Sequence, residues 1–263
     1  MVYRRRAFDH FDSILCVGPH HQEEIRATEA LYGLKSKILI EAGYGILDSI
    51  LRSRESTIGE LQQDGGFSKR VLIAPSWGED GLLETRGPEL VEVLLQAGHR
   101  VALRPHSMTR LHRPNLLAGL RRRFASSPDF HLDLAPTSQG TVHASDIMIS
   151  DWSGAALEFA FGLERPVLFV DVPRKVNNPE YERIPCVPIE VKLRTEIGAV
   201  VSPDSLSQVP ALVDRLCQDP DLWKERIREL RSRWIYNVGT SAKVAAAYIA
   251  KAAETAGISG AGS

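Results

Sequence analysis

The stretch that decides the fold is residues 145–171, SDIMISDWSGAALEFAFGLERPVLFVD. It contains two apolar segments, Ile147–Ser150 and Val167–Val170, separated by a segment with helical character at 154–161. Short segments that are apolar throughout are typical of strands buried on both faces of a sheet. The stretch therefore predicts a strand–helix–strand unit of a parallel sheet.

The same alternation continues on both sides of this unit. Further strands are predicted at 13–17, 37–41, 70–74 and 100–103, and helices at 20–32, 47–61, 87–97, 115–124, 206–218, 220–234 and 241–255. Residues 62–69 are polar and contain Gly65-Gly66, which predicts a linker or loop. Strands alternating with helices favour an α/β fold with a doubly wound parallel sheet.

Composition excludes several classes of protein. The 263 residues are 43% hydrophobic and 25% charged, as expected of a globular protein with a sizeable core. A net charge of −1 gives no electrostatic reason to expect nucleic acid as a partner. The three cysteines lie far apart, without a zinc or disulfide pattern, which fits a reducing cytoplasm. We expect neither a signal peptide nor a membrane span, since no apolar run reaches about 18 residues.

Polar and small residues follow the predicted strands. Ligands of open α/β sheets bind beyond the carboxyl ends of the strands, so these residues are candidates for a site. Ser153 and Gly154 stand where a helix begins, and the unpaired N–H groups there suit a phosphate. Glu158 lies about one and a half turns further on, in a position to accept hydrogen bonds from a ribose. A serine cap with Glu158 on a solvated face is the alternative.

The loop after the strand at 100–103 is cationic. No acidic residue occurs between Glu92 and Asp129, whereas arginines and histidines are frequent there. Such a loop beside a helix N-terminus suits a diphosphate, although residues 121–123 alone are more typical of a solvated helix end or of contact with acidic lipid headgroups. Together, the polar and small candidates after the strands are Ser76, Trp77, Arg104, His106, Ser107, Arg110, Ser150, Asp151, Ser153, Gly154 and Asp171.

Several segments carry a family resemblance. Residues 145–154 resemble the motif "sDvlITDYSS" of the CDP-glycerol glycerophosphotransferase family, the teichoic-acid polymerases and primases, and residues 155–171 resemble its "fDfa…kPiifY..D". Residues 43–48 resemble "GyPrnD" and residues 74–77 resemble "aPTwR". Arg104-Pro105-His106 resembles "lHP" with two residues exchanged, and Asn237-x-Gly239-x-Ser241 resembles "dGkas". The matches follow the family's order.

The resemblance implies a GT-B fold, with two Rossmann-like domains and a cleft for a nucleotide diphosphate. Residues 1–62 are then expected to be the tail of an acceptor-side α/β domain, and residues 68–236 the Rossmann-like nucleotide-binding domain. Residues 237–256 would form a helix that packs back, followed by a disordered tail at 257–263. By the same resemblance, an acceptor hydroxyl attacks the β-phosphorus of CDP-glycerol or a similar donor.

The resemblance also implies roles for residues and partners. His106 is expected to be catalytic, and the donor is expected to be held by Arg104, Ser107, Ser150, Asp151, Ser153, Gly154 and Glu158, with further contacts from Ser76, Trp77, Arg110 and Asp171. The acceptor is expected to be lipid-linked or a polymer of the cell envelope. No cofactor or metal is expected. A cytoplasmic location follows, with peripheral contact at the inner face of the membrane.

Two departures from the family keep alternatives open. The chain has no His-Gly pair, the motif that carries the family's base, which favours a non-catalytic nucleotide-binding domain. Gly154 replaces the second serine of "DYSS", and Ser153-Gly154 with Glu158 is similar to the "SGG…E" of UDP-N-acetylglucosamine 2-epimerases. An enzyme acting on a UDP-sugar, either a glycosyltransferase or such an epimerase, is the other alternative.

Overall fold

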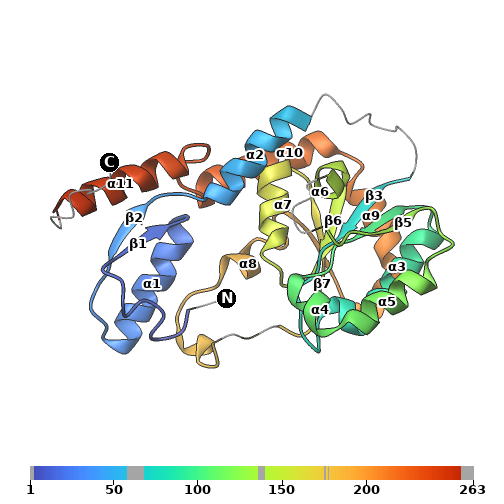
Figure 1. Cartoon of the computed structure of the whole chain (residues 1–263), viewed down its shortest axis with the longest axis horizontal. Coiled ribbons are helices and arrows are strands. Elements are labelled where there is room, and N and C mark those ends of the chain that lie inside the picture. Colours follow the sequence, from blue (N-terminus) through green and yellow to red (C-terminus); the bar gives the residue numbers. More distant parts are fainter. Residues whose placement is uncertain (1–2, 58–67, 136–139, 175, 177, 256–263) are drawn as a thin grey trace, which may run out of the picture. The chain divides into compact units, whose positions relative to one another are not determined.

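A computed structural model describes residues 3–57, 68–135, 140–174, 176 and 178–255 (Figure 1). The chain forms two compact units. Unit 1 comprises Met1–Arg52, Val176–Pro188 and Glu229–Ser263, and unit 2 comprises Ser53–Lys175 and Ile189–Arg228. The predicted linker at 62–69 and the predicted disordered tail at 257–263 lie largely or wholly outside the described residues.

Unit 2 is built on a six-stranded, fully parallel sheet with the strand order β5-β4-β3-β6-β7-β8. From the central strand β3 the chain moves outward through β4 to β5, then returns to β6 on the other side of β3 and continues through β7 to β8. The predicted doubly wound α/β sheet is therefore confirmed, with its switch point between β3 and β6. The strands are β3 (Arg70–Ile73), β4 (Arg100–Leu103), β5 (Phe130–Leu132), β6 (Ile147–Ser150), β7 (Val167–Val170) and β8 (Gly198–Val201).

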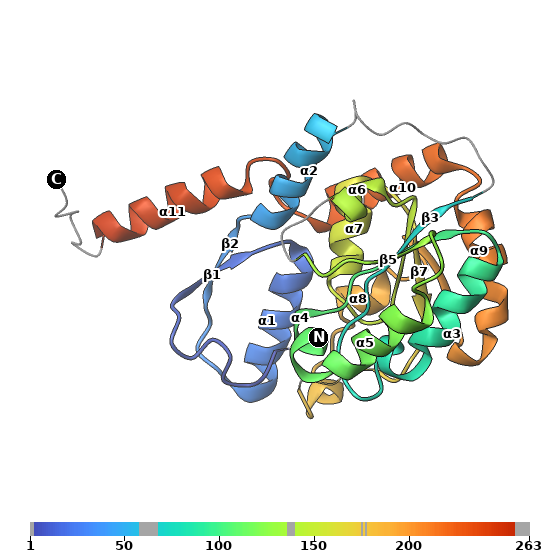
Figure 2. The ribbon, with the colours of Figure 1, turned by 45° about the vertical axis from the view of Figure 1, so that its right-hand side comes forward.

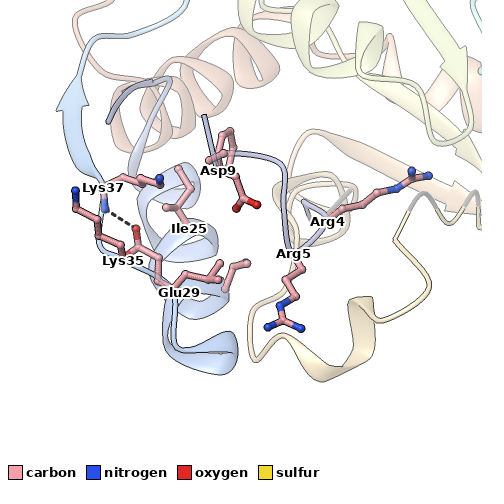
Figure 3. Close-up of a pocket in the computed structure, with 10 residues that line it drawn as sticks. Arg4, Arg5, Asp9, Ile25, Glu29, Lys35 and Lys37 are labelled. Atoms are coloured by element: carbon pink, nitrogen blue, oxygen red, sulfur yellow. Dashed lines mark hydrogen bonds between the residues drawn. The ribbon is translucent and has the colours of Figure 1, made fainter. Parts of the chain in front are cut away.

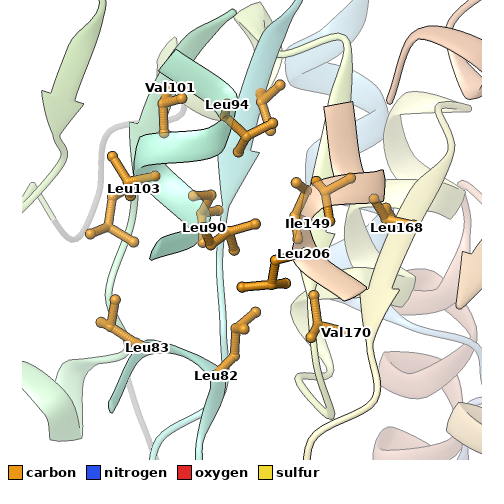
Figure 4. Close-up of a cluster of buried hydrophobic side chains, with 14 of the residues drawn as sticks. Leu82, Leu83, Leu90, Leu94, Val101, Leu103, Ile149, Leu168, Val170 and Leu206 are labelled. Atoms are coloured by element: carbon orange, nitrogen blue, oxygen red, sulfur yellow. The ribbon is translucent and has the colours of Figure 1, made fainter. Parts of the chain in front are cut away.

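Helices cover both faces of this sheet (Figures 1 and 2). The main apolar core lies between one face and helices α3, α5 and α9, where the strand residues Ile149, Leu168 and Val170 belong to one cluster with Leu90 and Leu94 of α3 (Figure 4). Helix α7 contacts β6 and β7. The helices of unit 2 are α3 (Leu82–Gln96), α4 (Ser107–His112), α5 (Pro114–Arg123), α6 (Gly140–Ala144), α7 (Ala155–Leu163), α8 (Ile189–Lys192) and α9 (Val209–Leu216).

Unit 1 begins with a β–α–β element. Strands β1 (Ser13–Cys16) and β2 (Ile38–Glu41) pair in parallel, with α1 (Pro19–Tyr32) between them in the chain. Helix α11 (Ser241–Thr255) belongs to the same unit. Helices α2 (Gly45–Thr57) and α10 (Pro220–Trp234) contribute residues to both units. Among the described residues, no helix combines the length and apolarity that crossing a membrane requires.

A buried carboxylate joins two distant segments of unit 1. Asp48 Oδ1 accepts a hydrogen bond from the backbone N–H of Gly239 at 2.7 Å, and Oδ2 accepts from the N–H of Ser241 at 2.9 Å and from its hydroxyl. Gly43 has a φ of +96°, and a Cβ there would lie 2.3 Å from the Tyr236 carbonyl oxygen, so the close approach requires glycine. Two of the family-like segments are thereby brought together.

Some predicted boundaries are wrong. Helix α3 begins at Leu82 rather than residue 87, and Pro88 lies inside it. The predicted helix at 206–218 is divided into a 3₁₀ segment, Pro203–Gln208, and α9. Sequence patterns also missed β5, β8, α4, α6 and α8, all of which are six residues long or shorter and therefore show little periodicity.

Candidate functional site

The loop between β6 and α7 is anchored by two buried side chains. The Ser150 hydroxyl donates to the Ala74 carbonyl oxygen at 2.7 Å. Asp151 Oδ1 accepts from the backbone N–H of Ser76 at 2.7 Å, and Oδ2 accepts from the N–H of Leu82 at 3.2 Å. The Asp151 carboxylate thus ties the loop after β6 to the loop after β3 and to the start of α3. These contacts fix the backbone at the switch point.

The N-terminus of α7 lies in this anchored loop. The Ser153 hydroxyl oxygen accepts a hydrogen bond from the N–H of Ala155 at 3.3 Å, as expected of a serine near a helix start. Gly154 is the N-cap and is exposed, and a Cβ built on it would meet no other part of the chain within 4 Å. Glu158 is half-buried in the first turns of the same helix. The helix end is therefore open on the side of Gly154.

Three aromatic rings connect the loops after β3 and β4. The Trp77 ring stacks on His106, with 6.3 Å between centroids, and on His112 at 6.2 Å. His106 caps α4, because its Nδ1 accepts from the N–H of Met108 at 3.1 Å. A neutral imidazole with an accepting Nδ1 carries its proton on Nε2, so the ring is a hydrogen-bond donor through Nε2.

Helix α4, which carries His106 at its N-cap, is itself anchored by a contact that the sequence did not indicate. The hydroxyl of the buried Thr109 donates to Glu84 Oε1 of α3 at 3.1 Å. Ser107 is exposed and Arg110 is half-buried on the same helix. The contact joins α4 to the helix whose first N–H is held by Asp151.

The cationic stretch is partly neutralised by acids outside it. Arg113 pairs with Glu79 at 3.2 Å and Arg123 pairs with Glu92 at 2.6 Å. The Arg104 guanidinium reaches the Ala135 carbonyl oxygen at 3.5 Å. Two arginines of this stretch, which has no acidic residue of its own, therefore form ion pairs with acids elsewhere in the chain. Such surface ion pairs add little stability.

On the other side of the β6 loop lies an arginine that sequence reasoning missed. Arg194 Nη1 pairs with Asp171 Oδ1 at 2.6 Å, and its guanidinium carbon lies 3.9 Å from the centroid of the Trp152 ring. The indole N–H of Trp152 donates to the Val172 carbonyl oxygen at 2.8 Å. Asp171 is one of the predicted candidates, whereas Arg194 follows the one-turn helix α8 and no sequence motif marks it.

Unit 1 has a hollow of its own, of about 200 Å³ (Figure 3). Apolar side chains, Ile25 among them, and several charged ones line it. Its buried carboxylate, Glu29, is engaged by Arg26 at 2.6 Å and by the backbone N–H of Lys37 at 2.7 Å. In Figure 3 the Arg4 side chain extends away from Glu29. The hollow therefore combines basic side chains with a buried carboxylate that is already paired.

Known structures with similar folds are GT-B proteins, which confirms the predicted fold class. The wall teichoic acid polymerase TagF, carrying a histidine-to-asparagine substitution and soaked with CDPG, matches with a TM-score of 0.57 at 16% identity, covering 94% of this chain and 57% of that one. The UDP-GlcNAc 2-epimerase of Methanocaldococcus jannaschii matches with a TM-score of 0.57 at 12% identity, covering 93% and 63%. The pneumococcal O-GlcNAc transferase GtfA matches with a TM-score of 0.54 at 13% identity, covering 95% and 46%. The chain thus spans less than two thirds of each of these proteins.

The sequence match to a family is more specific than these likenesses of fold. Curated protein sequences gave no match to the chain. The family described as CDP-glycerol:poly(glycerophosphate) glycerophosphotransferase, however, matches residues 4–175, which is more than half of the chain. This range includes the switch-point loops and the start of α7. The chain therefore belongs to the CDP-glycerol:poly(glycerophosphate) glycerophosphotransferase family.

Proposed function

We propose that unit 2 binds the nucleotide diphosphate of an activated polyol phosphate, CDP-glycerol or a close analogue. The observation that carries the proposal is the open N-terminus of α7 at the switch point of the sheet, anchored by Asp151. The positive end of the helix dipole favours phosphate there, and the exposed Gly154 leaves room for it. Family membership and the CDPG soaked into TagF support the choice of donor.

The residues around α7 take distinct parts in this proposal. Ser153 and Gly154 contact the phosphates, and Glu158 accepts hydrogen bonds from the ribose. Ser150 and Asp151 position the loop, because their side chains are buried in contacts with the protein. Further contacts come from Ser76, Trp77, Arg104, Ser107, Arg110 and Asp171 at the carboxyl ends of β3, β4 and β7.

His106 acts as a hydrogen-bond donor in this proposal. Its Nδ1 accepts from Met108, so Nε2–H is the group that donates to a phosphate oxygen. The oxygen of the acceptor hydroxyl forms a bond to the β-phosphorus, the bond from that phosphorus to the bridging oxygen breaks, CMP leaves with the electron pair, and the hydroxyl proton passes to water. Stabilising the charge on the departing CMP is the larger part of catalysis in phosphoryl transfer. The acceptor is proposed to be a lipid-linked or polymeric polyol of the cell envelope.

The test is acceptor-dependent release of CMP from CDP-glycerol, measured for the wild type and two histidine variants. His106→Asn keeps a side chain that caps helices but removes the imidazole donor, and we expect the rate to fall about 100-fold. His112→Asn is the matched control, because His112 stacks on the same Trp77 ring as His106. Equal rates in the wild type and His106→Asn would remove His106 from the reaction.

Two alternatives predict different results in the same assay. The missing His-Gly pair favours a non-catalytic domain, which would bind CDP but release no CMP when the acceptor is added. The Ser153-Gly154 and Glu158 arrangement favours a UDP-sugar enzyme, and the epimerase and GtfA structures, which contain UDP, share the fold. That reading predicts turnover of a UDP-sugar and none of CDP-glycerol.

A further inference from the structure

Arg194 is a buried cation whose hydrogen-bonding capacity is only partly used. Its side chain is 8% exposed, and Nη1 is paired with Asp171. Nε and Nη2 are also buried, and within the described part of the chain neither has a hydrogen-bond partner. Guanidinium N–H groups in protein interiors are normally paired with acceptors, often with the two oxygens of one phosphate or carboxylate. The geometry therefore marks Arg194 as a ligand-binding residue.

A second guanidinium lies on the same aromatic ring. The guanidinium carbon of Arg174 is 4.9 Å from the centroid of the Trp152 ring, against 3.9 Å for Arg194. The hydrogen bond from the Trp152 indole N–H to Val172 fixes the ring between the loops after β6 and β7. Asp171 is the carboxylate paired with Arg194, so two positive charges and one negative charge converge beside Trp152.

These residues border a hollow large enough for a phosphate ester. It has a volume of about 650 Å³ and is lined by Trp152, Asp171, Arg174, Arg194 and Thr195, among others. A second, much narrower hollow is lined by Arg194 together with Ser153 and Glu190. Arg194 therefore borders both the wide hollow and the loop at the N-terminus of α7. The wide hollow is lined by two arginines and one carboxylate, whereas the narrow one is lined by one arginine and two carboxylates, so the wide side is the one that suits an anion.

We propose that Arg194 and Arg174, held on Trp152, form a phosphate subsite next to the N-terminus of α7. The proposal rests on the proposed function and deepens it. The phosphate comes from one of two sources, the distal phosphate of the nucleotide donor or a phosphodiester of the acceptor. In either case the forked guanidinium of Arg194 supplies two N–H donors to one phosphate group.

Calorimetric titrations with CMP, CDP, inorganic phosphate and glycerol 3-phosphate test the subsite. Arg226→Gln is the matched control for Arg194→Gln, because Arg226 pairs with Glu196 at 2.8 Å and lies over Trp223 on the surface. If the donor supplies the phosphate, we expect CDP to bind at least about tenfold more tightly than CMP in the wild type. That advantage should fall below about threefold in Arg194→Gln and stay unchanged in Arg226→Gln.

The acceptor as source predicts another result. Glycerol 3-phosphate should then bind in the presence of saturating CDP. The Arg194→Gln variant should lose the binding of glycerol 3-phosphate and keep the binding of CDP. Arg194→Gln that binds all four compounds like the wild type would overturn the subsite. Wild-type protein that binds phosphate through Arg194 but does not bind CDP would leave the subsite standing and overturn the proposed function. Wild-type protein that binds none of them would overturn both.

Two further variants guard against misfolding. Arg194→Lys keeps the charge beside Asp171 but replaces the fork by one ammonium group, so we expect weakened phosphate binding with an unchanged melting temperature. In Trp152→Phe the change in tryptophan fluorescence on adding phosphate should disappear. A fluorescence response that persists in Trp152→Phe would place the bound phosphate elsewhere and contradict the proposal.

Discussion

At the scale of single residues, Asp151 is the residue on which the site depends most. It stands in the middle of the family-like motif, yet its carboxylate is 1% exposed and accepts backbone N–H groups of Ser76, Leu82 and Trp152. A carboxylate in such a place is a structural clamp rather than a ligand for phosphate, with which it would clash electrostatically. We infer that Asp151 contributes to function by fixing the backbone of the loops that contact the donor.

Replacing Asp151 by alanine tests this clamp. The change leaves buried N–H donors without their acceptor, so we expect the free energy of unfolding to fall by about 3 kcal/mol. Urea denaturation measures it. Asp204→Ala is the control, because Asp204 is 79% exposed in its ion pair with Arg86 and should lose less than about 1 kcal/mol. Equal losses in the two variants would show that Asp151 is no more structural than a surface acid.

Gly154→Glu separates binding from folding at the start of α7. Its side chain has room, since a Cβ at this position meets no other part of the chain within 4 Å, and negative charge is compatible with a helix N-terminus. We expect stability within about 1 kcal/mol of the wild type. CDP affinity should fall at least about tenfold, because the carboxylate repels the diphosphate. A variant that binds CDP normally would exclude this helix end as the phosphate site.

At the scale of elements, the sequence predicted the strands that are apolar throughout and the helices that follow them. It misplaced the start of α3 because the residue that caps this helix is distant in the chain. The first N–H, that of Leu82, donates to Asp151, 69 residues away. It missed α4 because the cap is a histidine ring nitrogen, which helix-start rules do not anticipate. Short elements held by neighbours carry no periodic signal of their own.

The Asp48 clamp of α11 can be tested through hydrogen exchange. Asp48→Ala removes the acceptor of the Gly239 and Ser241 N–H groups at the start of α11. We expect amides in the first turns of α11 to exchange at least about tenfold faster, because the loss is local to that helix. Asp9→Ala, which removes an exposed pair with Arg6, is the control and should leave these rates unchanged. Unchanged rates in Asp48→Ala would mean that α11 is held by other contacts.

We expect the stability of unit 2 to depend on pH through His143, a buried residue of helix α6. Burial lowers the pKa of His143 below its ordinary value of 6.5, and the neighbouring charges of Arg165 and Arg54 lower it further. The unfolded chain therefore binds more protons as the pH falls through about 6.5, so stability is full above that pH and is lost below it. Burial lowers the pKa of His99 as well, which adds to the same trend.

Unfolding in urea at about pH 7.5 and about pH 5.5 measures this effect. We expect the free energy of unfolding to be lower at the acidic pH, and the difference to shrink in His143→Gln. His131→Gln, at an exposed position of β5, is the control and should keep the full difference. An undiminished difference in His143→Gln would assign the pH dependence to other groups.

At the scale of the whole molecule, the order of the short motifs along the chain indicated the family, although each motif alone was weak evidence for it. It gave the family, which the match over residues 4–175 confirms, and the fold class. It did not indicate that unit 1 gathers three separate segments of the chain. Nor did it give Arg194, whose significance depends on burial and on the Trp152 ring, which only the folded structure defines.

The central claim is that unit 2 binds a nucleotide diphosphate at the N-terminus of α7. Its most direct test is calorimetric titration of the chain with CDP, UDP and CMP. We predict one site, with CDP bound more tightly than UDP and at least about tenfold more tightly than CMP, because the second phosphate contacts the helix end. A preference for UDP would move the assignment to sugar chemistry. A folded protein that binds none of the three would contradict the claim.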